Sequence, residues 1–154
     1  MDQEFQFLSF QSPVGLIWIA EKQGRLTDLR IGGLAQPEQT SPLLQESVRQ
    51  LSAYFSGKLN HFDLPLAPKG TAFQLEAWQG LREIPFGSTR SYLQQAQSIG
   101  RPQAQRAVGG ANRRNPIPII IPCHRVINHD GGIGGYAFGL EMKRFLLHLE
   151  GLDL

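Results

Sequence analysis

The stretch from Ser91 to Pro116 reads SYLQQAQSIGRPQAQRAVGGANRRNP and predicts two short helices joined by a tight turn. Ser91-Tyr-Leu-Gln94 has the spacing of a capping box, in which both side chains bond the backbone at a helix start. We expect that helix to run to Gly100. Arg101-Pro102 should begin the next helix, with Pro102 in its first turn, where a missing N–H costs nothing, and Asn115-Pro116 should end it. The pattern is a helix-turn-helix outline, although such an outline alone also occurs by chance in helical bundles.

The flanking residues extend this helical half of the chain. Thr71-Ala-Phe-Gln74 is a second capping box, followed by apolar residues at helical spacing and a break at Pro85-Phe-Gly87. We expect Ile117-Pro-Ile-Ile-Ile-Pro122 to be a buried extended strip. A glycine-rich loop with Gly131, Gly132, Gly134 and Gly135 follows it, and a final helix is expected from about Leu140 to Glu150.

The first third of the chain alternates apolar and polar residues, which favours strands. We expect an antiparallel meander of strands over 5–10, 16–20 and 26–31, then an amphipathic helix over 44–55 that Gly57 ends. The fold class is therefore α+β. It comprises a small N-terminal antiparallel-sheet domain over 1–64, a linker over 65–70, and a helical domain with the helix-turn-helix over 71–154.

Length and composition exclude several classes of protein. The 154 residues are 41% apolar and 18% charged, which argues against a disordered tail or a coiled coil. No apolar run approaches the roughly 20 residues of a membrane span, and the polar, acidic start of the chain is unlike a secretory signal. A single cysteine cannot build a disulfide framework or a multi-cysteine zinc cage, so we expect a cytoplasmic protein without metal or other cofactor.

Charge is unevenly distributed along the chain. The segment from Ile84 to His129 holds six arginines and no acidic residue, whereas the formal net charge of the whole chain is only +2. A locally cationic segment on a nearly neutral protein is typical of a face that meets phosphates. The alternative is an ordinary solvated face.

Three residues are candidates for a catalytic site that uses a thiol nucleophile. Cys123 precedes His124, and a thiol needs a base to become a thiolate. Glu150, at the end of the last helix, could orient that histidine as the third group of a triad does. The alternatives without a catalytic role are that Cys123 is a small buried apolar side chain and that Glu150 lies at a solvated helix end.

Ile121-Pro-Cys-His-Arg-Val126 resembles the active-site signature of the O6-alkylguanine-DNA alkyltransferase family. The resemblance continues through most of the C-terminal half, including Ile84-Pro85-Phe-Gly87, Arg106-Ala-Val-Gly109 and Gly135-Tyr136, and Ser12-Pro-Val-Gly15 resembles the family's N-terminal start. It implies a ribonuclease-H-like N-terminal domain. It also implies irreversible, single-turnover transfer of an alkyl group from O6-alkylguanine, and less efficiently from O4-alkylthymine, to the cysteine.

The family's catalytic roles map onto residues of this chain. By resemblance, Cys123 is the nucleophile, His124 passes its proton, Glu150 orients His124, and Asn115 holds the turn that presents the cysteine. The substrate-binding residues implied are Tyr92 for the swung-out guanine, the backbone carbonyls of Cys123 and Val126 for its amino group, the loop around Tyr136 as a lid, and the backbone N–H of Ala137.

The resemblance also implies a partner, which is double-stranded DNA containing O6-alkylguanine, bound through the minor groove. Arg106 would enter the duplex and fill the space of the flipped base. The further residues expected to contact DNA are Ser91, Ala104, Arg113, Arg114 and Arg125. We expect a protein that does not bind membranes and is a monomer in solution, able to cluster on DNA.

Two other functions remain open from the residues alone. A related group of proteins lacks the cysteine and only binds lesions, so a lesion-sensing protein that does not transfer alkyl groups is one alternative. A thiol hydrolase that uses Cys123, His124 and Glu150 is the other. Some relatives hold zinc in the N-terminal domain, but that region here has no cysteine and a single histidine, His61, so no metal is expected.

Overall fold

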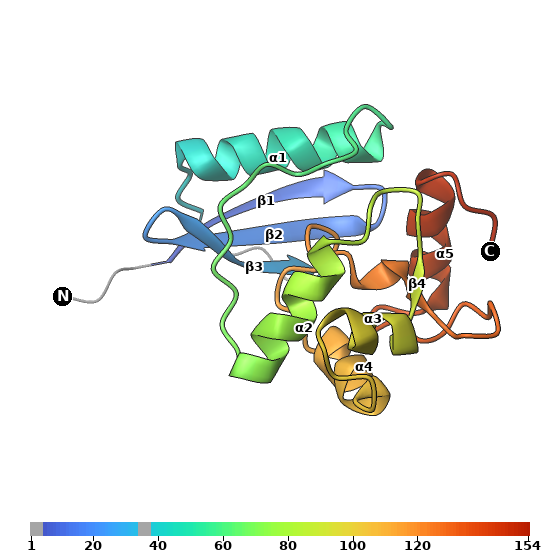
Figure 1. Cartoon of the computed structure of the whole chain (residues 1–154). Coiled ribbons are helices and arrows are strands. Elements are labelled where there is room, and N and C mark those ends of the chain that lie inside the picture. The colour runs from blue at the N-terminus through green and yellow to red at the C-terminus, as the bar shows by residue number, and fades with distance from the viewer. Residues whose placement is uncertain (1–4, 34–37) are drawn as a thin grey trace. The chain divides into compact units, whose positions relative to one another are not determined.

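Two compact units make up the chain, residues 1–69 and 70–154. The computed structural model describes residues 5–33 and 38–154, so the acidic start of the chain at 1–4 lies outside the described residues. The predicted α+β class is confirmed, with a small antiparallel sheet in the first unit and a helical second unit (Figure 1). Among the described residues, no helix is both long and apolar enough to cross a membrane.

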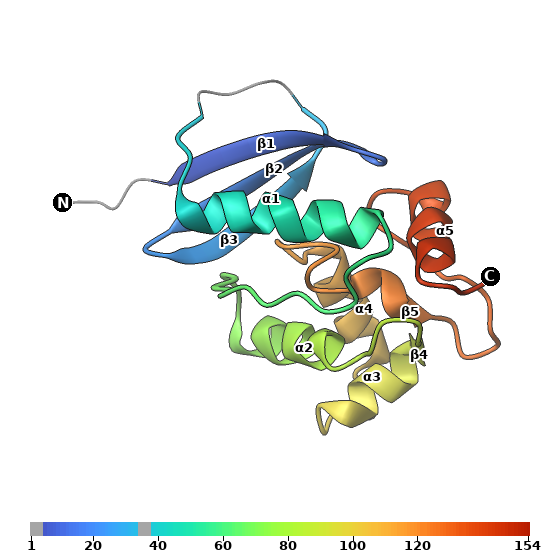
Figure 2. The ribbon, with the colours of Figure 1, turned by 90° about the horizontal axis from the view of Figure 1, so that it is seen from above.

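The first unit is a three-stranded sheet with one helix. Strands β1 (Gln6–Ser12), β2 (Gly15–Lys22) and β3 (Arg25–Ile31) pair antiparallel in sequence order. Ile17 and Ile19 on the central strand are fully buried. Helix α1 (Pro42–Phe55) lies along the sheet and contributes the buried Leu44 and Leu51 (Figure 2). The meander and the helix follow the sequence prediction, with strand ends differing by one or two residues.

The segment expected to be a linker is partly ordered against the first unit. The backbone N–H of Leu26 donates to the Pro65 carbonyl at 2.9 Å, and the N–H of Ala67 donates to the Leu26 carbonyl at 2.8 Å. Residues 65–67 therefore cover the free edge of β3, because an unpaired strand edge leaves backbone groups unsatisfied.

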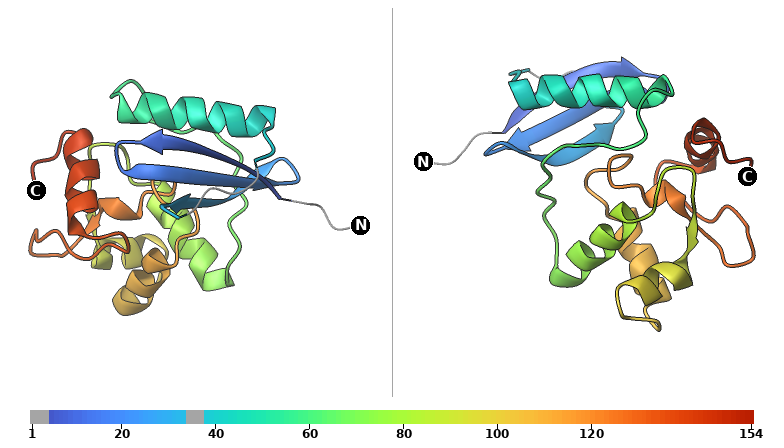
Figure 3. Two further views of the ribbon diagram at one scale, coloured as in Figure 1. Left: turned by 180° about the vertical axis from the view of Figure 1, so that it is seen from behind. Right: turned by 45° about the horizontal axis from the view of Figure 1, so that its top comes forward.

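The second unit is built from short helices around one two-stranded ladder. Helices α2 (Ala72–Arg82), α3 (Tyr92–Ser98) and α4 (Gln105–Arg113) pack beside one another, as the views of Figure 3 also show, and α5 (Leu140–Leu149) ends the chain. The ladder is parallel and joins β4 (Arg90–Ser91) to β5 (Val126–Ile127). Both predicted capping boxes are present, Thr71 with Gln74 and Ser91 with Gln94.

Helix α4 begins later than the sequence predicts. Gly100 adopts a φ of +75°, and the Arg101 N–H donates back to the Ala96 carbonyl at 2.9 Å, which terminates α3. The Ala104 N–H donates to the Arg101 carbonyl at 3.0 Å, so Pro102 lies in a turn between the helices, where proline is favoured. The expectation that Pro102 stands in the first turn of a helix is therefore wrong.

The expected extended strip over 117–122 is also wrong. The Ile121 N–H donates to the Ile117 carbonyl at 2.9 Å, so the segment folds back on itself. Ile119, at its apex, has a φ of +73°, a conformation that is unfavourable for a β-branched residue. The strip is nevertheless buried as expected, because Ile117, Ile119 and Ile121 have no exposed surface.

Candidate active site and nucleic-acid interface

The turn that presents Cys123 is held by one asparagine. The Asn115 Oδ1 accepts the Ile117 N–H at 3.0 Å, and the Asn115 Nδ2 donates to the Ile121 carbonyl at 2.7 Å. A single side chain thus bonds both ends of the folded-back segment and fixes the backbone immediately before Cys123. Surroundings that over-determine a backbone in this way are what a strained residue such as Ile119 requires.

Cys123 begins a short 3-10 turn (Cys123–Arg125) and is 7% exposed. Burial raises the pKa of its thiol to about 11, although the Asn115 side chain and the charge of Lys143 partly oppose that rise. The resting residue is therefore a protonated thiol at neutral pH. Reaction of its sulfur requires a base or a change of surroundings when a substrate enters.

His124 and Glu150 form the buried centre of the site. The His124 Nε2 and the Glu150 Oε2 are 2.6 Å apart, and neither side chain is exposed. Arg125 binds the same carboxylate, with its Nε donating to Glu150 Oε1 at 2.8 Å. Burial alone would raise the pKa of Glu150, but the bonds and charges of His124 and Arg125 together lower it to about 2. The carboxylate is therefore ionised.

The state of the histidine follows from these partners. Burial lowers the pKa of His124, and the opposing effect of Glu150 does not overcome it. A neutral ring beside a carboxylate carries its proton on the nitrogen that faces the carboxylate, which is Nε2. The Nδ1 is then a lone-pair acceptor. It is buried and has no hydrogen-bond partner among the described residues, so the ring presents a free base.

A second group of residues meets at the glycine-rich loop. The β4–β5 pairing places the start of α3, and so Tyr92, beside the end of the Cys123 turn. A side chain at Gly134 would lie 3.3 Å from the Tyr92 hydroxyl and 3.4 Å from the Lys143 Nζ. Burial raises the pKa of Tyr92, so its hydroxyl is a neutral donor. The absence of a side chain at Gly134 lets these two polar groups approach the loop backbone.

Lys143 is a residue of this site that the sequence reasoning missed. It is fully buried, and its Nζ donates to the Val126 carbonyl at 2.6 Å and to the Gly135 carbonyl at 2.9 Å. It thereby joins the strand after Cys123 to the glycine-rich loop. Burial lowers its pKa to about 8. The available signal was its position on the apolar face of α5, at helical spacing from Leu146, Leu147 and Glu150.

The expected substrate residues lie on the same segments. The Val126 carbonyl already accepts from Lys143, so a guanine amino group would have to use its second lone pair. The Tyr136 hydroxyl is buried and has no partner among the described residues. The Tyr136 carbonyl accepts the Gly139 N–H at 3.1 Å, which closes a tight turn that leaves Ala137 exposed.

The residues expected to contact DNA fall into two groups. Arg106, Arg113 and Arg114 are exposed on α4 or at its end, Ser91 caps α3, and Ala104 precedes α4 without a side-chain cap. The helix α4 thus presents three cations and, at its start, backbone N–H groups without a side-chain partner, a combination suited to an anionic partner.

Arg125 is a correction to the predicted DNA-contacting set. It is 7% exposed. Beyond its two bonds to Glu150, its Nη1 donates to the Ile84 carbonyl at 2.7 Å. A guanidinium whose donors are committed to buried partners cannot reach phosphates, so Arg125 belongs to the Glu150 cluster.

No group of His, Cys, Asp or Glu among residues 5–33 and 38–154 is arranged to hold a metal ion. The reactive groups described above are a buried thiol, an imidazole bound by a carboxylate, and a set of polar groups around the glycine-rich loop.

Comparison with known proteins bears on both units. Residues 72–152 match the 6-O-methylguanine DNA methyltransferase, DNA binding domain, and residues 7–68 match the ribonuclease-like domain of 6-O-methylguanine DNA methyltransferase. A methylated-DNA–protein-cysteine methyltransferase of Methanosarcina barkeri is 53% identical over 147 residues, which is 91% of this chain and 93% of that protein.

Solved structures agree with the sequence matches. The crystal structure of Mycobacterium tuberculosis O6-methylguanine methyltransferase superimposes with a TM-score of 0.85 at 42% identity, covering 96% of this chain and 93% of the other. Mycobacterium tuberculosis OGT in complex with DNA superimposes with a TM-score of 0.84 at 45% identity, over 95% of this chain and 91% of the other. With both of its units matched, the chain belongs to the 6-O-methylguanine DNA methyltransferase family.

Proposed function

We propose that this protein repairs DNA by moving the alkyl group of O6-alkylguanine, and less efficiently of O4-alkylthymine, onto the sulfur of Cys123. The observation that carries the proposal is the buried Cys123 followed in the chain by His124, whose ring is bound by Glu150, in a chain of this family. The relatives' names describe methyl transfer from DNA to a protein cysteine, and one solved relative is bound to DNA.

The chemical step is a displacement at the alkyl carbon. A bond forms between that carbon and Cys123 Sγ while the bond from the carbon to guanine O6 breaks. The thiol proton passes to His124, directly or through a water molecule. The guanine leaves as an anion and takes a proton at N1 from solvent, and His124 returns the thiol proton to solvent, so the protons balance. Glu150 keeps the proton of His124 on Nε2, which leaves Nδ1 to accept.

The target atom lies inside a stacked duplex, so we propose that the base swings out into the site. Unstacking costs a few kcal/mol and least for a poorly paired base, which gives part of the selectivity. Arg106 would fill the vacated space, and the Tyr92 hydroxyl would donate to the extruded guanine. The small residues of α4 allow close approach to the groove and read little sequence.

The product is a thioether, and the chain has no second thiol to remove it. We therefore propose one transfer per molecule, by a monomer that can cluster on DNA. A single unpaired thiol suits a reducing compartment, so the cytoplasm is the proposed location.

Incubation with duplex DNA that carries labelled O6-methylguanine tests the proposal. We expect one labelled methyl group per chain, found by intact-mass measurement and mapped to the peptide that contains Cys123. If the label stays in the DNA while the protein binds it, the protein senses lesions without transfer. Repeated turnover with recovery of the free thiol would instead indicate a hydrolase.

The Cys123→Ser variant is the matched control. It should take up no label, because serine has no thiol to ionise and its hydroxyl is a poor nucleophile. It should still bind the lesion-containing duplex. Loss of both transfer and binding would show that the cysteine has another role.

A further inference from the structure

Two buried amide side chains join the helices of the helix-turn-helix. The Gln95 Nε2 donates to the Asn112 Oδ1 at 2.8 Å, and the Asn112 Nδ2 donates back to the Gln95 Oε1 at 2.8 Å. Gln95 is fully buried on α3, and Asn112 is 7% exposed on α4. The Gln95 Nε2 also reaches the Ala77 carbonyl of α2 at 3.3 Å. We call these two residues the amide pair.

The surroundings of the amide pair are apolar. The buried cluster between the three helices consists of small side chains: Ala77, Ala96, Val108 and Ala111. In such a site two apolar side chains of the same shape hold a fold together about as well as a hydrogen-bonded pair does. What a reciprocal amide pair adds is a single preferred alignment of the two helices, because a slide of α4 along α3 breaks both bonds of the pair. The Gln95 Oε1 and both polar atoms of the Asn112 side chain are then left buried without the partners they have here.

The register of α4 links two parts of the proposed reaction. Arg106 lies on its exposed side, and Asn115, which holds the Cys123 turn, follows two residues beyond its end. The Asn115 N–H donates to the Asn112 carbonyl at 3.3 Å. The rise of a helix is about 1.5 Å per residue, and a misplacement of about 1 Å can cost a hundredfold in rate. The position of α4 along its axis is therefore a kinetic variable.

We propose that Gln95 and Asn112 are positioning residues. They fix the position of α4 along its axis, so that Cys123 faces the swung-out base when Arg106 occupies the duplex. The proposal rests on the proposed function. It predicts a specific defect, in which reaction with a base inside a duplex suffers and reaction with a free base does not. A free base does not have to leave a duplex, so Arg106 plays no part in its reaction. The rate with the free base therefore depends on the Cys123 site alone.

The Gln95→Met/Asn112→Leu double variant separates positioning from stability. Both substitutions keep the shape of the side chain and remove its polar atoms, so neither partner is left unsatisfied. Each single variant leaves one buried amide alone and should have a lower unfolding midpoint than the double variant. Gln97→Met, on the exposed side of α3, is the matched control.

Four measurements are made on each protein: the unfolding midpoint in urea, the rate with free O6-benzylguanine, the rate with an O6-methylguanine duplex, and the intact mass. We expect the double variant to unfold near the wild-type midpoint and to react with the free base at the wild-type rate. Its rate with the duplex should fall about tenfold or more. Gln97→Met should match the wild type throughout.

Equal rates of the double variant and the wild type on the duplex overturn the inference, as does an equal loss on both substrates. The wild-type intact mass keeps the two hypotheses apart, because a wild type that gains no methyl group contradicts the proposed function itself. A second measurement needs no variant. The side-chain amide protons of the pair should exchange slowly with solvent in the free protein and stay protected on DNA, and loss of that protection on DNA also overturns the inference.

Discussion

Glu150 is the residue on which most of the site converges. Its two carboxylate oxygens bind His124 and Arg125, and its backbone N–H still closes α5 onto the Leu146 carbonyl at 3.1 Å. At a helix end the dipole disfavours a carboxylate, and the bonds from His124 and Arg125, with the Gly87 N–H at 3.5 Å from Oε1, stabilise the charge. The carboxylate therefore has a structural task as well as a proposed chemical one.

The structural role of the Glu150 carboxylate predicts that Glu150→Gln changes how the free energy of unfolding depends on pH. The pKa of Glu150 is lowered from 4.5 to about 2, so its stabilisation is present above pH 4.5 and is lost as the pH falls toward 2. Urea unfolding between pH 2 and 7 should show a weaker variant whose stability falls less on acidification. Parallel curves for the two proteins would contradict the assignment.

The thiol of Cys123 should ionise only at high pH. Because burial raises its pKa to about 11, alkylation by iodoacetamide in the absence of DNA should accelerate by about tenfold per pH unit from pH 7 to 10. Mass spectrometry gives the rate, with N-acetylcysteine as the reference whose rate levels off near the ordinary pKa. A plateau for Cys123 below pH 9 would show that the resting site already holds a thiolate.

Under the proposed function, helix α4 is the element that links DNA binding to the reaction at Cys123. Arg106→Ala should slow repair of a duplex more than the reaction with free O6-benzylguanine, because only the duplex needs the space of the flipped base filled. Single-turnover rates on both substrates measure the split. An equal loss on both would remove the support for an extrahelical base.

Helix α3 depends on its cap. The Ser91 Oγ accepts the Gln94 N–H at 3.0 Å, and the Gln94 Oε1 accepts the Ser91 N–H at 2.8 Å. Ser91→Ala should lower the free energy of unfolding by about 1 kcal/mol. Gln97→Ala, on the exposed side of the same helix, serves as the control and should change it by a few tenths at most. Urea denaturation at neutral pH gives both values.

The elements of the fold that can be predicted from the sequence are those whose cause is local. The two capping boxes and the strands of the meander depend on residues close in the chain, and all were predicted. The start of α4 was not, because the Arg101 N–H is taken by Ala96 and a turn through Pro102 intervenes. Likewise, the fold of 117–122 depends on one side chain, Asn115, that bonds residues two and six positions away.

The residues of the candidate site also divide into those that the sequence could identify and those that it could not. Cys123, His124 and Glu150 could be named from the resemblance, and the structure brings the side chains of His124 and Glu150 together. Arg125 and Lys143 could not be placed, because nothing in the sequence tells whether a cation is buried. Their surroundings come from segments far along the chain, Ile84 for Arg125 and Gly135 for Lys143.

At the scale of the whole molecule, cationic charge should govern affinity for DNA. Arg113 and Arg114 are exposed at the end of α4. If each binds a phosphate, replacing either with alanine should reduce the slope of log affinity against log salt by about 1. Fluorescence anisotropy over a salt series measures this slope.

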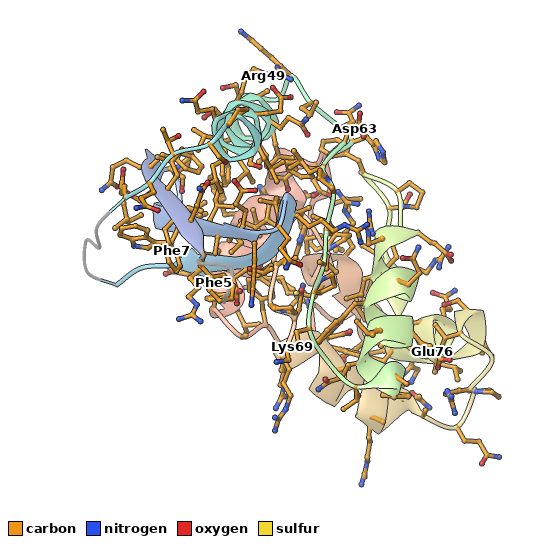
Figure 4. All side chains as sticks on the ribbon, turned by 90° about the vertical axis from the view of Figure 1, so that its left-hand side faces the viewer. Phe5, Phe7, Arg49, Asp63, Lys69 and Glu76 are labelled. Atoms are coloured by element: carbon orange, nitrogen blue, oxygen red, sulfur yellow. The ribbon has the colours of Figure 1, made fainter. Side chains whose placement is uncertain are left out.

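A matched control for the salt series comes from the other unit. Arg49, on the outer side of α1 (Figure 4), pairs with Glu46 at 2.5 Å. Arg49→Ala should leave the slope unchanged. A similar change for all three variants would indicate that net charge, rather than a defined contact, sets the salt dependence.

The seclusion of the Cys123 sulfur has a consequence for the lifetime of the protein as a reagent. Under the proposed single transfer, any stray electrophile or oxidant that reaches the acceptor sulfur first would consume one molecule of the protein. The burial that raises the pKa of the thiol would then preserve unreacted molecules until a damaged base arrives.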